Sequence, residues 1–409
     1  MSSRSCKISS CAIAADCVAG KRVGVGQELD CITRRNQVKS AENLIRIAGV
    51  QLTEQEIAAV VEVLRSGHLV AGEAVQAFEE HFAKEVGACY AVAVSSGTAA
   101  LHIAYLAVLQ PGDEVLVPGF THISTASMVH FANGRPVLCD VDRRSFTLDV
   151  EDAAQKISAR TAAVAPVHLF GNSCDIDGVN RLAQGHNLKI IWDAAQAHAT
   201  RYRGRDVGSF SDLVTYSFYP TKNMTTGEGG MIVTNDPELY EGCKLLRGHG
   251  QTRKYCHESF GLNYRMTDIA GALGLKQLQQ LPRFVEKRRY NAAYLNERLT
   301  KVDGITVPFV ANSIDHSFHQ YTILLDLDQF RCSRDEFAAT LKTQGVEAVV
   351  HYPRAINQQP ALRAGTVPLP NCEWLSQRVM SLPVHPLLST RDLEQIADTV
   401  IRVAARMRR

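Results

Sequence analysis

The residue whose surroundings best suit it to a chemical reaction is Lys222, in the segment TYSFYPTKNMTTGEGGMIVTN at residues 215–235. It follows an apolar run that predicts a buried strand and precedes a group of glycines, so it does not belong to a solvated helix face. A lysine amine is a nucleophile only when deprotonated, and burial lowers its pKa from a reference value of about 10.4. Partial burial beside Tyr219 and Pro220 would therefore prepare Lys222 to form a Schiff base with an aldehyde.

Further polar groups follow other apolar runs. After CYAVAV, Gly97 permits close backbone approach, and a helix beginning near Thr98 would point its free N–H groups at a phosphate. Asp193 ends KIIWD, with the amide of Gln196 three residues further on, and Ser217 lies in LVTYSF, five residues before the lysine. In a parallel sheet ligands collect beyond the carboxyl ends of the strands, so we expect these groups to meet at one edge.

A planar side chain would complete a cofactor site. The segment GFTHIST follows DEVLVP and offers Phe120 and His122 as flat surfaces. A phosphate cradle, a carboxylate, a lysine and a planar side chain together meet the needs of pyridoxal phosphate, whose ring withdraws electrons only while its nitrogen is protonated beside a carboxylate. Each part alone also fits ordinary structure, such as a helix cap for Asp193 or a turn for Gly97.

Other chemistries find less support in the sequence. His168, His198 and His249 follow no ligand spacing and lack a second carboxylate, so no metal site is expected. Neither GxxxxGK[ST] nor a GxGxxG after the first strand is present. With 44 Lys+Arg against 42 Asp+Glu the net charge is +2, which favours small-molecule partners over nucleic acid or a membrane surface.

Cysteine usage and hydropathy bear on the compartment. The eleven cysteines are odd in number and include no CxxC pair, which favours a reducing cytoplasm over a disulfide framework. No apolar run approaches the roughly 18 residues that cross a bilayer. We therefore expect a cytoplasmic protein without a membrane anchor.

The elements that must position these residues predict an α/β fold. QLTEQEIAAVVEVLRSG predicts a helix, with a capping box at Thr53 and Glu56 and a stop at Gly67. Seven short apolar runs then alternate with helical segments: CYAVAVS, DEVLVP, RPVLCDV, AAVAPVHLF, KIIWD, LVTYSF and GMIVT. Such near-continuous runs predict a large, mostly parallel seven-stranded sheet flanked by helices on both faces.

The pattern changes after Gly261. MTDIAGALGLKQLQQL and PRFVEKRRYNAAYLNERL predict a pair of helices, the second opened by Pro282. Beyond about residue 300, HQYTILLDLD and VEAVVHYP predict strands, and SRDEFAATLKTQG and TRDLEQIADTVIRVAARMRR predict helices. These elements indicate a smaller α+β domain.

Three regions follow from this reading. Residues 1–40 lack periodicity and carry seven Lys/Arg against three Asp/Glu, so they predict a flexible N-terminal extension. Residues 41–290 form the large cofactor-binding domain. Residues 291–409 form the small C-terminal domain.

Five motifs in order make the sequence similar to a known family: SSGTAALH, PVHLFG, DAAQAHAT, SFYPTKNMTTGEGGMIVT and GLNYRMTDIAGALG. They resemble the sugar aminotransferases of the DegT/DnrJ/StrS family, which have the fold type I architecture of pyridoxal-phosphate enzymes. The resemblance runs from about residue 46 to the C-terminus and leaves only the extension uncovered.

The resemblance implies a role for each matching residue. Lys222 would bond to the cofactor aldehyde and move the substrate proton, while Asp193 would pair with the ring nitrogen. The cofactor would also contact Gln196 near its hydroxyl, and its phosphate would be held by Gly97, Thr98 and Ser217.

Two implied roles concern the surroundings of the cofactor. Asn263 of GLNYRM would reach the phosphate of the neighbouring subunit's cofactor, which requires a homodimer with shared active sites. The ring-stacking position aligns with His122, where the family usually has an aromatic residue, and Phe120 is the alternative.

The function implied is transfer of an amino group from L-glutamate or L-glutamine to a keto carbon of a nucleotide-linked deoxysugar, for amino-sugar, surface polysaccharide or secondary-metabolite synthesis. Cations on predicted loops, namely Arg253, Lys254, His351 and Arg354, either face the diphosphate or are plain surface charges. Alternatives are an aminocyclitol aminotransferase, a ketosugar dehydratase and a non-catalytic sensor. The dehydratases of this family carry histidine in place of the lysine, so Lys222 favours transamination.

Overall fold

The structure is a computed structural model that describes residues 44–210, 212–362 and 367–409. The extension predicted at residues 1–40 lies outside these ranges. Residues Leu44–Arg409 form one compact unit. The first described helix, α2 (Glu54–Ser66), confirms the predicted capping box of Thr53 and Glu56 and the stop at Gly67, which adopts the left-handed conformation with φ of 73°.

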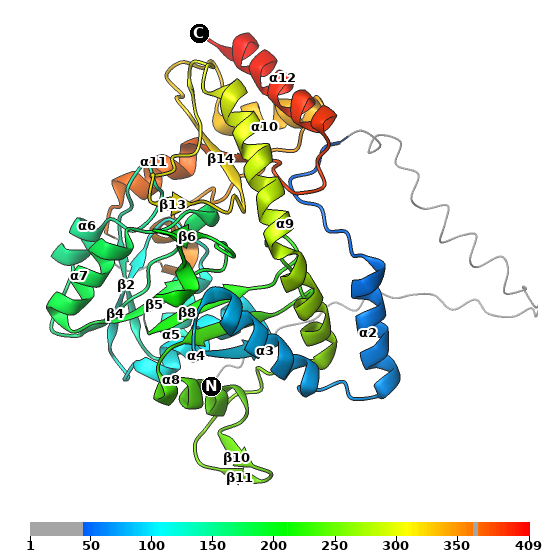
Figure 1. Ribbon diagram of the computed structural model, residues 1–409. Helices are drawn as coiled ribbons and strands as arrows, with labels where there is room; N and C mark the ends of the chain where they lie inside the picture. Colours follow the sequence, from blue (N-terminus) through cyan, green and yellow to red (C-terminus); the bar gives the residue numbers. More distant parts are fainter. Residues whose placement is uncertain (1–43, 211, 363–366) are drawn as a thin grey trace, which may run out of the picture. The chain divides into compact units, whose positions relative to one another are not determined.

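A seven-stranded sheet forms the centre of the fold, in the order β1-β9-β8-β5-β4-β2-β3 (Figure 1). Its strands are β1 (Tyr90–Val94), β2 (Glu114–Pro118), β3 (Arg135–Cys139), β4 (Thr161–Val164), β5 (Lys189–Asp193), β8 (Leu213–Ser217) and β9 (Gly230–Thr234). Neighbouring strands are parallel from β8 to β3, and β9 pairs antiparallel with both β1 and β8. The prediction of a mostly parallel seven-stranded sheet is confirmed.

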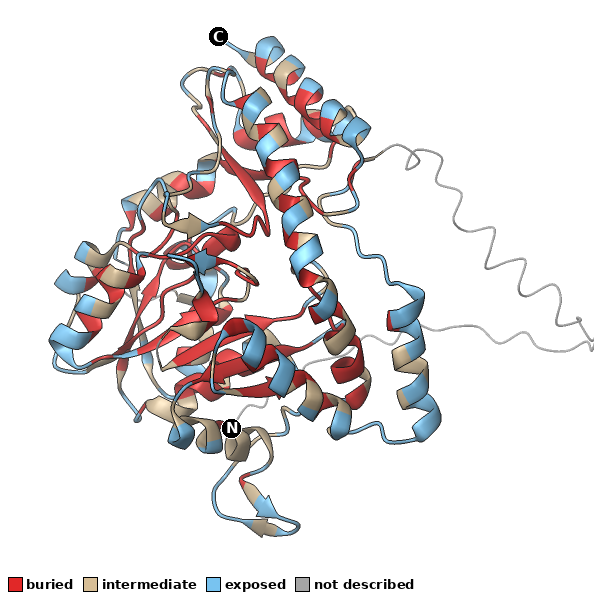
Figure 2. Ribbon diagram, viewed as in Figure 1, coloured by how far each residue is buried: buried red, intermediate tan, exposed pale blue. Residues whose placement is uncertain are grey.

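Helices cover both faces of the sheet. Alternate residues of each strand point to opposite faces, so each strand contributes apolar side chains to a core on both sides. Ala91 and Ala93 of β1 belong to a core shared with α3, α6, α7 and the first half of α9, whereas Val92 and Val94 belong to a core shared with α4, α5 and α8. These helices are α3 (Glu73–Val86), α4 (Gly97–Val108), α5 (Ser124–Phe131), α6 (Val150–Gln155), α7 (Ile176–His186), α8 (Pro237–Arg247) and α9 (Asp268–Leu299). The buried strands between these layers are shown in Figure 2.

The predicted helix pair at residues 266–299 is in fact one 32-residue helix, α9, with Pro282 inside it. Proline cannot donate to the carbonyl four residues earlier, which favours a helix break. Here Pro282 is exposed, and packing on both sides of it keeps the helix continuous: Leu278, Leu281 and Val285 enter the sheet core, and Leu295 enters a second core. The domain boundary proposed at residue 290 thus falls inside α9, which belongs to both proposed domains.

The second core gathers the C-terminal elements. Apolar residues of α9, β14, β15, α10 and α12 form it. The elements in this part of the chain are β12 (Ile305–Thr306), β13 (Ile314–Asp315), β14 (Tyr321–Leu325), α10 (Arg334–Thr343), α11 (Pro370–Arg378), β15 (Val379–Leu382) and α12 (Thr390–Met407). The strand predicted over VEAVVHYP is wrong: Val346 and Val349 make isolated bridges, to Ile45 and to Ser381 of β15, and the pairing does not extend along the segment.

Small hairpins complete the architecture. The strands β6 (Arg201–Tyr202) and β7 (Arg205–Asp206) pair with each other, and β13 joins them. A second hairpin of β10 (Gln251–Arg253) and β11 (Cys256–His257) projects away from the sheet (Figure 1).

Phe78 of α3 allows a test of the sheet core. It is fully buried, and its ring centroid lies 5.9 Å from that of Phe82 and 5.2 Å from that of Phe218. We expect Phe78→Ala to lower the free energy of unfolding by about 3–5 kcal/mol, measured by chemical denaturation. Phe309→Ala, at a ring that is 36% exposed and lies under the Arg144 guanidinium, should cost about 1 kcal/mol. Equal losses in the two variants would contradict this account of the core.

Candidate active site

A cavity of about 360 Å³ lies at the carboxyl edge of the sheet. Most of the residues that line it lie at or just after the ends of β1, β2, β5 and β8, as expected for a parallel sheet. Seven of the predicted cofactor residues line it, together with the predicted substrate residue His351: Gly97, Thr98, His122, Asp193, Gln196, Ser217 and Lys222. The fold therefore brings eight of the residues predicted from the sequence to one cavity.

One end of the cavity is a helix N-terminus suited to an anion. The helix α4 begins at Gly97, and its N-cap Ser96 accepts a hydrogen bond from the Ala99 N–H at 3.1 Å. The N–H groups of Gly97 and Thr98 have no acceptor within the helix, so they can bind a phosphate. A Cβ atom at Gly97 would lie 2.6 Å from the Cβ of Ser217, so only glycine allows this approach to the serine.

The other end holds a buried carboxylate. Asp193 is 4% exposed. Its Oδ2 accepts a hydrogen bond from Thr125 Oγ1 at 2.9 Å, and its Oδ1 accepts one from the Ala195 N–H at 3.0 Å. Burial raises the pKa of Asp193 despite these bonds and the nearby Lys222. The two oxygens keep acceptor capacity that a cationic N–H inside the cavity would satisfy.

Lys222 lies in the loop between β8 and β9, and its backbone N–H donates to the Tyr219 carbonyl at 2.9 Å. Burial lowers the pKa of its amine to about 8, and the attraction of Asp193 opposes this shift only in part. The environment that the sequence predicted for this lysine is therefore present, and a substantial fraction of the amine is neutral near pH 8.

Histidines around the lysine add no positive charge. Burial lowers the pKa of His351 to about 4 and that of His198 to about 3, and it holds the pKa of His319 well below its usual value. Each of these shifts is reinforced by repulsion from Lys222. The ring nitrogens Nδ1 of His319 and His351 have no partner within the described chain, and both residues line the cavity.

The geometry favours His122 over Phe120 as the planar surface. His122 lines the cavity, whereas Phe120 is 1% exposed and packs in a core with Leu369 and Cys372. The Ser124 N–H donates to His122 Nδ1 at 3.2 Å, which places the proton of a neutral ring on Nε2. Burial also lowers the pKa of His122, so the neutral form is favoured.

Three predicted residues lie away from this cavity. Asn263 bridges to Gly248 beyond α8, and Arg253 belongs to the projecting β10–β11 hairpin. Arg354 is exposed two residues after Tyr352, which does line the cavity. Within one chain, none of the three belongs to the cavity lining.

The sequence reading missed Thr125, His319 and Tyr352. Gln196 donates to Tyr352 Oη at 3.1 Å and accepts from the Phe170 N–H at 2.8 Å, so Tyr352 fixes an amide that was predicted. Its place next to His351 in HYPRAINQQP was the only available signal. Thr125 is far from Asp193 in the sequence, and His319 is far from Lys222. Only folding brings the members of each pair together.

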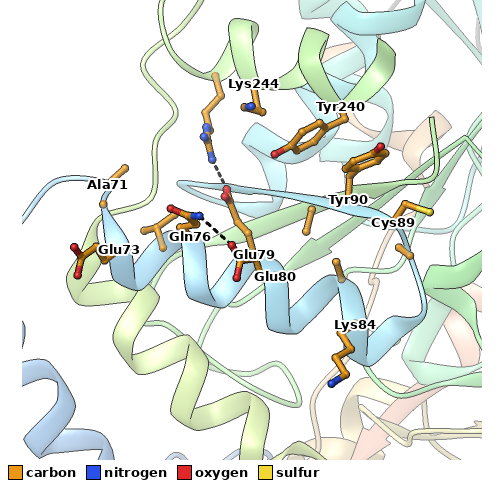
Figure 3. A pocket seen from close by; sticks show the side chains of 16 residues that line it. Ala71, Glu73, Gln76, Glu79, Glu80, Lys84, Cys89, Tyr90, Tyr240 and Lys244 are labelled. Atoms are coloured by element: carbon orange, nitrogen blue, oxygen red, sulfur yellow. Dashed lines mark hydrogen bonds and ion pairs between the residues drawn. The ribbon is translucent and has the colours of Figure 1, made fainter. Parts of the chain in front are cut away.

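A more open cavity of about 960 Å³ lies along the edge strand β1 (Figure 3). Within it Arg247 binds Glu79 at 2.5 Å, and the two side chains also bond the Ala93 carbonyl and N–H. This pair caps the exposed edge of the sheet, and none of the predicted cofactor residues lines this cavity. The smaller cavity is therefore the candidate site.

Comparison with known proteins identifies the family of the chain. The sequence model of the DegT/DnrJ/EryC1/StrS aminotransferase family matches residues 50–401. The chain belongs to this family.

Named relatives of this aminotransferase cover most of its length. GDP-perosamine synthase of Caulobacter vibrioides is 38% identical over 330 residues, which are 80% of this chain and 88% of that protein. The dTDP-3-amino-3,4,6-trideoxy-alpha-D-glucose transaminase of Streptomyces venezuelae is 36% identical over 369 residues, 89% of this chain and 96% of that protein. A crystal structure of DesV of the same organism, in complex with a ketimine intermediate, has a TM-score of 0.82 at 36% identity and covers 85% of this chain and 94% of its own.

Two further observations concern other classes of function. In the ranges that the structure describes, no group of three or more metal-ligating side chains comes together. No helix there combines the length and the apolar character needed to cross a membrane.

The lowered pKa of Lys222 makes a prediction for the cofactor-free aminotransferase. Below pH 8 the folded protein must keep a desolvated ammonium, which destabilises it; between pH 8 and 10.5 the unfolded chain binds this proton and the folded chain does not, so stability rises with pH. We expect Lys222→Met to raise the free energy of unfolding at pH 7 by about 1–3 kcal/mol, and this gain to vanish by pH 10.5. Chemical denaturation at both pH values measures it.

The control is Lys254→Met, at an exposed lysine of the β10–β11 hairpin. It should give no gain at pH 7. A Lys222→Met variant that is no more stable than wild type at pH 7 would show that the amine is well solvated.

Proposed function

We propose that this aminotransferase is a pyridoxal-phosphate enzyme that moves an amino group from L-glutamate or L-glutamine to a keto carbon of a nucleotide-linked deoxysugar. The observation that carries the proposal is one cavity shared by Lys222, the buried Asp193 carboxylate and the N-terminus of α4. The names of two relatives, which specify GDP and dTDP sugars, support the acceptor class.

The residues present fit pyridoxal phosphate at three points. Gly97, Thr98 and Ser217 offer donors for its phosphate, Asp193 offers an acceptor for a protonated ring nitrogen, and the Lys222 amine can bond to its aldehyde. When bound, the cofactor supplies an electron sink that allows a proton to leave the carbon that carries the amino group.

Lys222 is the residue proposed to move that proton. A general base works best when its pKa is close to the working pH, and burial brings the pKa of Lys222 to about 8. Asp193 lies near enough to favour the protonated amine, while neutral His319 and His351 neither repel it strongly nor compete for the proton. Lys222 can therefore accept and return a proton without a second base.

His122 and Gln196 would orient the ring. The Gln196 side chain is held by Tyr352 and the Phe170 backbone, so its position does not depend on the ligand. The imidazole of His122 is held through Nδ1 by the Ser124 N–H, which fixes the plane that it presents to the cavity.

The acceptor would extend beyond the cavity. A volume of about 360 Å³ is near the lower end of the ~300–1,000 Å³ typical of ligand sites, which suits the cofactor and a reacting sugar ring. We therefore place the nucleotide outside, where Arg354 is exposed just beyond Tyr352. Arg253 and Lys254 would reach it only from another copy of the chain.

A homodimer with shared sites would bring such residues together. Exposed apolar side chains support an interface: Tyr255 is 85% exposed and Phe260 fully exposed near the β10–β11 hairpin, and Ile57 and Leu64 of α2 are 42% and 52% exposed. Asn263 follows the same hairpin and would contact the partner's phosphate site.

Sharing of sites predicts complementation between two inactive variants. Lys222→Ala lacks the amine, and Asn263→Ala weakens the partner's site, so a mixed dimer has one site with both residues intact. Co-refolded in equal amounts, the two variants should recover up to about a quarter of wild-type transaminase activity, since half the dimers are mixed and each has one intact site. Activity no higher than the sum of the separate variants would rule out a role of Asn263 in the partner's site.

The cofactor and the first half-reaction are tested by absorbance. Purified protein with pyridoxal phosphate should show a visible band that needs Lys222, and L-glutamate should bleach it and yield 2-oxoglutarate. Lys222→Ala should show neither, and Lys254→Ala should behave as wild type. A band that ignores glutamate and glutamine would point to another reaction, and the absence of any band would return the chain to a non-catalytic role.

A further inference from the structure

The helix α2 is attached to the rest of the protein in an unusual way. Its one buried residue is a glutamate, Glu56, which is 1% exposed, whereas Ile57 and Leu64 remain 42% and 52% exposed. Glutamate is almost never fully buried unless it is paired. The hydrogen-bond partners of this carboxylate therefore show which part of the protein α2 is attached to.

The carboxylate of Glu56 accepts hydrogen bonds from two directions. Its Oε2 accepts from the backbone N–H of Thr53 at 2.5 Å and from Thr53 Oγ1 at 2.8 Å, which completes the cap of α2. Its Oε1 accepts from the side-chain amide of Gln277 on α9.

Gln277 links Glu56 to the lysine loop, which we define as residues 218–229 between β8 and β9. Its Oε1 accepts from the backbone N–H of Thr225 at 3.0 Å. Gln277 is 3% exposed and Thr225 is 5% exposed. The amide orientation is fixed, because the Thr225 N–H can only donate and the Glu56 carboxylate can only accept.

Thr225 is a central residue of the lysine loop. Its Oγ1 donates to the Phe218 carbonyl at 2.8 Å and accepts from the Gly227 N–H at 3.0 Å, closing the loop on itself. Behind the loop a cavity of about 40 Å³ is lined by Lys222, Thr225 and Gln277 among others. The hydrogen bond between Thr225 and Gln277 therefore holds the loop against α9 beside a small gap in the packing.

We propose that Glu56 and Gln277 are positioning residues for Lys222, acting through the Thr225 N–H to hold the lysine loop in the geometry that buries the amine. The inference rests on the proposed function only for what Lys222 does once it is held. Neither residue contacts the cavity that contains Asp193, so neither is catalytic.

The series of hydrogen bonds from Glu56 through Gln277 to Thr225 can be tested by swapping the residue types at positions 56 and 277. Glu56→Gln places an amide where Gln277 needs an acceptor, so the Gln277 N–H or the Thr53 N–H loses its partner. In Glu56→Gln/Gln277→Glu the new carboxylate accepts from Thr225 and from Gln at position 56, whose oxygen accepts from Thr53, so every group regains a partner. Glu54→Gln, at an exposed glutamate in the same first turn, is the matched control.

The first measurement is hydrogen exchange of the cofactor-free protein. We expect the lysine loop of Glu56→Gln to exchange at least about tenfold faster than in wild type, and the double variant and Glu54→Gln to resemble wild type. Faster exchange confined to α2, or a double variant that fails to fold or exchanges like Glu56→Gln, would overturn the proposal.

The second measurement is the pH profile of cofactor capture, which a purely structural role would not shift. Wild type should show a midpoint near pH 8; in Glu56→Gln the hydrated amine should move it toward higher pH, with about fivefold to tenfold weaker cofactor binding. An unchanged midpoint and affinity would overturn the proposal. If wild type captures no cofactor, the proposed function fails, while hydrogen exchange still decides whether Glu56 holds the loop.

Discussion

The site depends on the burial of two opposite charges that are kept apart. Burial lowers the pKa of Lys222 and raises that of Asp193, so each group is pushed toward its neutral form, and their mutual attraction restores only part of the cost. No hydrogen bond joins their side chains among the described contacts. A ligand that brings a cationic ring nitrogen to Asp193 and an electrophilic carbon to Lys222 relieves both desolvation costs. A direct ion pair between Asp193 and Lys222 would leave neither side chain free to bind such a ligand. The desolvation that makes these two charges costly therefore also favours binding of such a ligand.

Much of this site could be predicted because its residues lie next to the ends of strands. Gly97, Asp193 and Ser217 each stand at the end of an apolar run, and a parallel sheet brings such ends to one edge whatever the details of the loops. The capping box at Thr53 and Glu56 is likewise local in sequence. Spacing along the chain is sufficient for features of this kind.

Features that depend on distant contacts could not be predicted in this way. Packing on both sides of Pro282 outweighed its tendency to break the helix. The valines of VEAVVHYP pair with Ile45 and with β15 at single residues, so they form no continuous strand. His319 and Tyr352 enter the cavity from positions more than a hundred residues beyond Asp193, and only the place of Tyr352 beside His351 gave a signal in the sequence. Arg253 and Asn263 were placed by resemblance rather than spacing, and within one chain they lie outside the cavity.

The reversed strand β9 explains why Lys222 stands on a loop that needs external support. Parallel neighbours require a crossover, usually a helix that packs on the sheet, but β8 and β9 are antiparallel and can be joined directly. The connecting residues 218–229 are therefore free of helical geometry and can place Lys222 over the strand ends. Because such a segment lacks a helix's internal hydrogen bonds, its backbone groups must find partners elsewhere. The Thr225 N–H finds one in Gln277, and Glu56, the one buried residue of α2, thereby becomes part of the support for the loop that carries Lys222.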